Sequence, residues 1–106
     1  MELVVGGKAQ GKLEYVIGLY GSDVKVINNL QDIIRENMDE AAVYDMIPAD
    51  SDVIVICDEI GCGLVPIDKF EREYRDLVGK ICCNLAKEAN KVHRVICGIG
   101  TVIKNA

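Results

Sequence analysis

The stretch Asp52-Val-Ile-Val-Ile-Cys-Asp-Glu-Ile-Gly-Cys-Gly-Leu-Val-Pro66 decides how this chain folds. Its first half, Val53–Cys57, is a continuous run of mostly β-branched apolar residues, which is typical of a central strand covered on both faces. An acidic pair, Asp58 and Glu59, follows at once, and a double-glycine turn comes next. Open α/β sheets bind ligands at the carboxyl ends of such strands. We therefore expect this junction to lie at a functional site.

A second strand-to-loop junction lies near residue 6. The mostly apolar residues 1–5 predict a short buried strand, and the loop Gly6-Gly7-Lys8-Ala9-Gln10-Gly11-Lys12 follows it. The loop fits the phosphate-loop pattern G-x-x-x-x-G-K-[ST] except at the last position, where Leu13 replaces the hydroxyl that holds Mg²⁺. Glycines let backbone N–H groups wrap a phosphate, and Lys12 would reach its terminal oxygens. We expect these seven residues to bind a nucleotide or phosphate; the alternative is a glycine-rich turn without a ligand.

Helical and strand patterns alternate along the rest of the chain. They predict helices over residues 12–20, 28–46 and 68–89, strands over 24–27 and 92–97, and a turn at 98–100 before a candidate edge strand. Such alternation implies a parallel sheet with right-handed crossovers. We predict an α/β fold, a three-layer sandwich with a small, mostly parallel sheet of about four strands, built as one domain by residues 1–106.

The longest predicted helix carries two local signals. Asp68 and Glu71 have the spacing of a capping box. Gly79 lies inside the helix, where glycine costs about 1 kcal/mol relative to alanine. We therefore expect Gly79 to mark the close approach of another segment.

Composition excludes several classes of protein. Half of the 106 residues are apolar and 27% are charged, as in a soluble globular domain, and the lack of Trp predicts an aliphatic core. The net charge of −5 argues against a nucleic-acid or anionic membrane partner. We find no run of about 20 apolar residues and no signal-peptide pattern. Five cysteines, an odd number, suit free thiols in the cytoplasm. An apolar-rich chain this short also predicts a homo-oligomer.

A few residues outside the loop are candidates for chemistry. Asp58 and Glu59 end the central strand, where a carboxylate can hold a metal or position a nucleophile; a polar strand end is the alternative. His93, the single histidine, lies inside the last strand and reads as a structural or surface residue. The cysteines have no strong metal-ligand spacing, so we expect no metal site.

The two junctions together resemble the adenosylcobinamide kinase / adenosylcobinamide-phosphate guanylyltransferase family of cobalamin biosynthesis. Members begin with a strand and a Gly-Gly-x-x-x-Gly-Lys-Ser loop, which corresponds to residues 6–13. They carry Asn-Glu-Val-Gly-x-Gly-Ile-Val-Pro after a central strand, which corresponds to residues 58–66. An Arg-Asp-x-x-Gly helix and a strand ending in Gly-Ile follow, as in Arg75–Gly79 and Val95–Ile99. The match is weak over residues 1–20 and good over 52–104.

The resemblance implies a P-loop NTPase-like fold and phosphoryl transfer to a cobinamide hydroxyl. It implies ATP or GTP as ligand, a corrinoid intermediate as partner, and Glu59 as a catalytic residue near the substrate or metal. Members are longer, however, and hold a guanylylated histidine and an Asp-Cys-Leu-Thr strand in their middle region. This chain has no histidine before His93 and Leu13 in place of the Mg²⁺ ligand. We therefore expect a shortened member with a degenerate phosphate loop and weak or absent Mg²⁺ binding; the alternative is a non-catalytic regulatory or scaffolding module with a vestigial loop.

Overall fold

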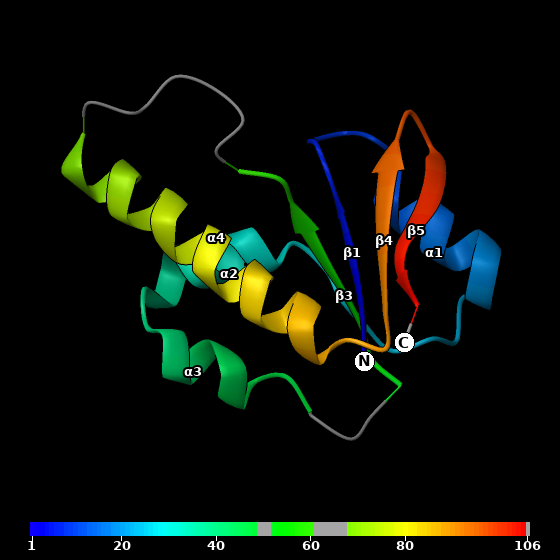
Figure 1. Cartoon of the computed structure of the whole chain (residues 1–106), viewed down its shortest axis with the longest axis horizontal. Helices are drawn as coiled ribbons and strands as arrows, with labels where there is room; N and C mark the ends of the chain where they lie inside the picture. The colour runs from blue at the N-terminus through cyan, green and yellow to red at the C-terminus, as the bar shows by residue number, and fades with distance from the viewer. Residues whose placement is uncertain (49–51, 61–67, 106) are drawn as a thin grey trace.

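The computed structural model describes residues 1–48, 52–60 and 68–105 (Figure 1). Its strands are β1 (Glu2–Gly6), β2 (Val26–Ile27), β3 (Ile54–Asp58), β4 (Lys91–Ile96) and β5 (Ile99–Asn105). Its helices are α1 (Lys12–Tyr20), α2 (Leu30–Asn37), α3 (Glu40–Asp45) and α4 (Lys69–Glu88). The sheet has the order β2-β3-β1-β4-β5, in which β5 alone is antiparallel to its neighbour. The predicted α/β class with a small, mostly parallel sheet is confirmed.

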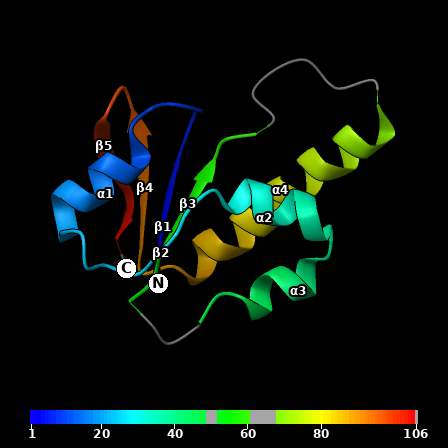
Figure 2. The same ribbon diagram turned by 180° about the vertical axis from the view of Figure 1, so that it is seen from behind.

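Helices cover both faces of the sheet, which gives the predicted three layers (Figures 1 and 2). Helix α1 packs on one face, while α2, α3 and α4 pack on the other. Successive side chains of a strand point to opposite faces, and β3 serves both cores. Ile54 and Ile56 belong to the core under α1, and Val55 and Cys57 to the larger core under α2 and α4. This double burial explains the uninterrupted apolar run in the sequence.

The segment predicted as one helix over residues 28–46 forms two helices, so that prediction is wrong at its centre. Met38 adopts a left-handed conformation with φ of 47°, which ends α2. Asp39 then caps α3, because its carboxylate accepts hydrogen bonds from the N–H groups of Ala41 and Ala42. The signal was Asp39 itself, a preferred N-cap residue hidden within an otherwise helical apolar spacing.

The tail after β4 forms the edge strand β5, so the sheet has five strands where about four were predicted. The connecting turn lies one residue earlier than expected. Cys97 and Gly98 have φ values of 51° and 75°, the two positive values that a tight hairpin turn requires. The hairpin therefore pairs Ile96 directly with Ile99.

Of the two sequence signals predicted for α4, the Asp68 cap is present, whereas the described residues make no close approach at Gly79. Asp68 caps the helix by accepting from the Glu71 N–H at 3.1 Å, whereas the Glu71 carboxylate binds Arg35 on α2. A Cβ added at Gly79 would meet no heavy atom within 4 Å in the described part of the chain, so the expected close approach is wrong. The backbone of another segment comes close at Gly6 instead, where an added Cβ would overlap the Val95 carbonyl oxygen. None of the described helices is long and apolar enough to cross a membrane.

These glycine environments predict opposite effects of two matched substitutions. Gly79→Ala should stabilise the fold by about 0.5–1 kcal/mol, because alanine favours the helix and finds open space. Gly100→Ala should destabilise it, because the new methyl group would overlap the Tyr15 ring. Urea unfolding of both variants measures the difference. A clear loss of stability in Gly79→Ala would contradict the packing described for α4.

Candidate functional site at the carboxyl ends of β1 and β3

The two junctions found in the sequence meet at one edge of the sheet. β1 and β3 are neighbouring parallel strands, and Gly6 pairs in register with Asp58. The N–H of Glu59 also donates to the Gly6 carbonyl at 2.7 Å. β1 leads into α1 on one face, and the next described helix after β3 is α4 on the other face. This is a topological switch point, where open α/β sheets bind ligands.

The loop over residues 6–12 is held against the turn between β4 and β5. The Gln10 carbonyl accepts a hydrogen bond from the Gly98 N–H at 2.7 Å. Its side-chain oxygen accepts another from the Cys97 N–H, also at 2.7 Å. Gly11 completes the loop with φ of 81°, a conformation that favours glycine. The loop is thus fixed by the hairpin beside it.

Lys12 is almost fully buried, with an exposed fraction of 7%, and points back into the site. Its Nζ lies 2.7 Å from Asp58 Oδ1 and donates to the Gly7 carbonyl at 2.7 Å. A buried ammonium group is tolerated only when it is paired and hydrogen-bonded. Asp58 therefore neutralises Lys12, the residue that the loop pattern predicts to contact a phosphate.

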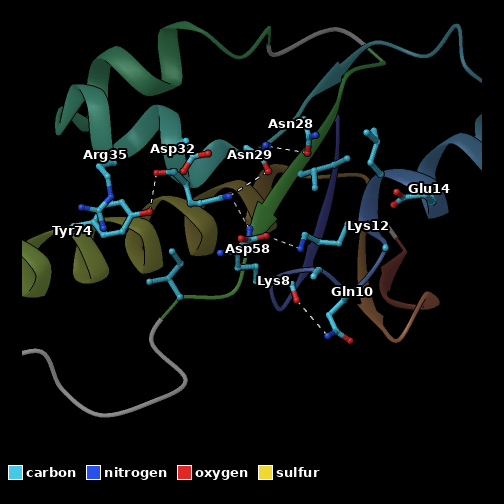
Figure 3. Close-up of a pocket in the computed structure, with 16 residues that line it drawn as sticks. Lys8, Gln10, Lys12, Glu14, Asn28, Asn29, Asp32, Arg35, Asp58 and Tyr74 are labelled. Atoms are coloured by element: carbon cyan, nitrogen blue, oxygen red, sulfur yellow. Dashed lines mark hydrogen bonds and ion pairs between the residues drawn. The ribbon is translucent and has the colours of Figure 1, made fainter.

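A pocket of about 600 Å³ opens beside this pair (Figure 3). The loop forms one wall, and the start of α2 with Tyr74 of α4 forms the other. Its lining includes three basic and three acidic side chains: Lys8, Lys12 and Arg35, and Glu14, Asp32 and Asp58. Among the described lining residues, basic and acidic side chains are thus equal in number, so they give the pocket no excess of positive charge.

Gln31 and Tyr74 build the wall opposite the loop. Gln31 is buried, and its side-chain oxygen accepts from the Asp58 N–H at 3.0 Å. The Tyr74 hydroxyl donates to the Gln31 carbonyl at 2.9 Å. The helical pattern predicted only a packing role for Tyr74, and no sequence motif pointed to Gln31. A glutamine two residues after the Asn28-Asn29 pair, among apolar helix positions, was the available signal.

Arg35 is held in a fixed orientation at the rim of the pocket. Its guanidinium makes two hydrogen bonds to the Glu71 carboxylate, at 2.7 and 2.8 Å, and lies 4.1 Å from the Tyr74 ring centroid. The Arg35 hydrogen bond lowers the pKa of Glu71 below its usual value. The Arg35 guanidinium is therefore already engaged in contacts with Glu71 and Tyr74.

Glu59, the predicted catalytic residue, does not line the pocket beside the loop. Its carboxylate binds Arg94, at 2.9 Å from Nε and 3.3 Å from the terminal nitrogen. It lines a second pocket, of about 320 Å³, between the sheet and α4. The structure thus pairs Lys12 with Asp58, whereas Glu59, the next residue along the chain from Asp58, pairs with Arg94.

His93 is 1% exposed and has partners on both ring nitrogens. Nδ1 lies 2.7 Å from the Tyr15 hydroxyl, and Nε2 lies 2.7 Å from Glu2 Oε1. Burial opposes ionisation of Glu2, but hydrogen bonds from Tyr20 and His93 outweigh it and lower the pKa of Glu2. His93 is therefore a buried structural residue. Within the described residues, no group of three or more His, Cys, Asp or Glu side chains is placed to hold a metal ion.

Comparison with known proteins decides the family. The model of the family described as cobinamide kinase / cobinamide phosphate guanyltransferase matches residues 17–103. The chain belongs to this family. Its fold is accordingly P-loop NTPase-like. The match begins after the loop over residues 6–12, so only the sequence and geometry of that loop indicate a phosphate site.

Two curated relatives match about half of the chain. It is 40% identical over 52 residues to the bifunctional adenosylcobalamin biosynthesis protein CobU of Escherichia coli (strain K12). It is 38% identical over 52 residues to the protein of the same name from Salmonella typhimurium (strain LT2). Each match covers 49% of this chain and 29% of the relative. The chain therefore spans less than a third of either relative.

The Glu2 network predicts a pH dependence of stability. Because the pKa of Glu2 is lowered on folding, its contribution is present above the unfolded pKa and is lost as the pH falls. Glu2→Gln should therefore reduce the loss of stability between about pH 5 and pH 3. Urea unfolding across this range measures the effect.

Glu36→Gln is the matched control, because Glu36 is an exposed carboxylate of α2. It should leave the acid dependence as in the wild type. An unchanged acid dependence in Glu2→Gln as well would contradict the lowered pKa of Glu2 in the folded chain.

Proposed function

We propose that this chain binds the phosphates of a nucleotide in the 600 Å³ pocket, through the loop over residues 6–12. The observation that carries the proposal is the position of Lys12 and the loop glycines at the switch point between β1 and β3. Carbonyls of Gly6, Gly7 and Gln10 accept hydrogen bonds from within the protein. The loop's backbone N–H groups and Lys12 are then what it offers an anion.

A bound phosphate must compete with Asp58 for Lys12. The two side chains are 2.7 Å apart and largely buried, so their attraction is little screened by solvent. The family resemblance places asparagine at position 58, which would leave the lysine charge available. Asp58 should therefore make this site weaker for anions than an asparagine-bearing loop.

Magnesium should add little to binding. Leu13 lines the pocket at the position where a phosphate loop carries its metal-binding hydroxyl, and its side chain has no ligand atom. Among the carboxylates that line the pocket, Asp58 at the end of β3 is already bound to Lys12. The ligand would then be held by direct contacts with the loop.

Family membership suggests a role in cobalamin biosynthesis, with a corrinoid as the second ligand. Covalent guanylylation does not fit His93, because both ring nitrogens are engaged inside the protein. Phosphoryl transfer involving Glu59 would require its carboxylate to leave Arg94. We therefore propose a nucleotide-binding family member that forms no histidine-linked intermediate.

A second proposal is self-association through β5, which suits a scaffolding or regulatory module. β5 is an edge strand, and its Ile99, Val102 and Ile103 side chains are 72%, 45% and 59% exposed. Apolar edge strands of this kind pair readily with another chain.

Binding to the loop can be measured by calorimetry with ATP and with inorganic pyrophosphate. Lys12→Met should weaken binding about 10- to 100-fold, because it removes a charge-assisted contact. Asp58→Asn should strengthen it several-fold, because Lys12 loses its competitor. EDTA should change neither result.

Lys25→Met is the control, since Lys25 is an exposed residue next to β2 at the opposite end of the strands. It should bind as the wild type does. Failure of nucleotide and pyrophosphate to bind at millimolar concentration would leave the loop as a turn. Tight binding that EDTA abolishes would place a metal in the site and contradict the proposed mode.

Self-association can be measured by light scattering at micromolar concentration. The wild type should be larger than a monomer, and Ile99→Lys should shift it towards the monomer because a charge opposes edge pairing. A monomeric wild type would remove the second proposal and leave nucleotide binding untouched.

A further inference from the structure

Two cysteines from distant parts of the chain meet beneath α4. Cys57 of β3 is fully buried in the larger core, and Cys82 of α4, a partly buried residue, packs against that core. Their sulfur atoms are 3.5 Å apart. Among the described cysteines, this is the one pair whose sulfurs lie within hydrogen-bond distance.

Cys82 is the member of the pair that an external reagent can reach. It lines the 320 Å³ pocket between the sheet and α4, whereas Cys57 has no exposed surface. The hydrogen bond with Cys57 lowers the pKa of the Cys82 thiol, and the same contact together with burial raises the pKa of Cys57. A thiolate is the reactive form of cysteine, so oxidation should begin at Cys82.

We propose that Cys57 and Cys82 form an oxidation site that closes to an intramolecular disulfide when a peroxide reaches the pocket. The Cys82 thiolate attacks one peroxide oxygen, the O–O bond breaks, and Cys82 becomes a sulfenic acid while the other oxygen leaves as water. Cys57 then attacks the Cys82 sulfur, the S–S bond forms, and the S–O bond breaks to release a second water. Two thiols are oxidised and one peroxide is reduced.

The geometry favours closure within this pair. A disulfide requires a sulfur separation of about 2.05 Å, so the two atoms must approach by roughly 1.5 Å. Rotation about the side-chain bonds of Cys82 and a small shift of α4 can supply this movement. The product joins α4 to the end of β3, one residue before Asp58. It does not depend on which ligand the loop binds.

The experiment uses the full chain, reduced and freed of reductant, and treated with an equimolar amount of hydrogen peroxide. Remaining thiols are blocked with N-ethylmaleimide in denaturant, so that a reduced Cys57 is also accessible, and the protein is analysed by intact mass and peptide mapping. We expect three of the five cysteines to be blocked, a cross-linked peptide containing Cys57 and Cys82, and reversal by dithiothreitol. The melting temperature should rise by roughly 5–15 °C on oxidation.

Cys83→Ser is the matched control, because Cys83 is an exposed thiol next to Cys82 on the same helix. It should form the same cross-link, whereas Cys82→Ser should form none and keep a reduced Cys57. Peroxide treatment that leaves all five thiols open to N-ethylmaleimide would overturn the proposal. So would a disulfide through Cys62, Cys83 or Cys97, or conversion of Cys82 to sulfinic acid beside an unmodified Cys57.

Discussion

The ion pair between Lys12 and Asp58 is the contact on which this structure depends. It joins the first residue of α1 to the last residue of β3, and the Gly7 carbonyl completes it. An ammonium group with an exposed fraction of 7% needs such partners, because an unpaired buried charge costs several kcal/mol. The pair therefore fixes the loop over residues 6–12 above the sheet. It also explains why the ends of β1 and β3 form one site.

The same pair limits what the site can do. A phosphate loop normally offers its lysine to the ligand, but here the lysine is neutralised within the protein. The described residues that line the pocket include equal numbers of acidic and basic side chains. One of the basic side chains, Arg35, is held by Glu71 and Tyr74. A ligand must rearrange existing contacts in order to bind.

Local sequence patterns could predict the elements but not most of the contacts between them. The apolar run of β3 and the helical spacing of α4 reflect burial within single elements, so periodicity revealed both. The break at Met38 was not predicted, because the helical spacing of apolar residues continues across it and hides the N-cap residue Asp39. The links of His93 to Glu2 and of Asp58 to Gln31 join residues 91 and 27 positions apart. Spacing along the chain carries no record of such contacts, and for the same reason Gly79 was mistaken for the site of close packing.

The central claim is that the loop, with Lys12 released from Asp58, receives an anion at the ends of β1 and β3. A titration of the ¹⁵N-labelled chain with inorganic pyrophosphate, followed by amide chemical shifts, tests it most directly. The account predicts saturable shifts in residues 7–12 and at Asp58, with little change in the β4–β5 hairpin beyond Cys97 and Gly98. Shifts confined to other surfaces, or no saturable shift at millimolar pyrophosphate, would contradict it.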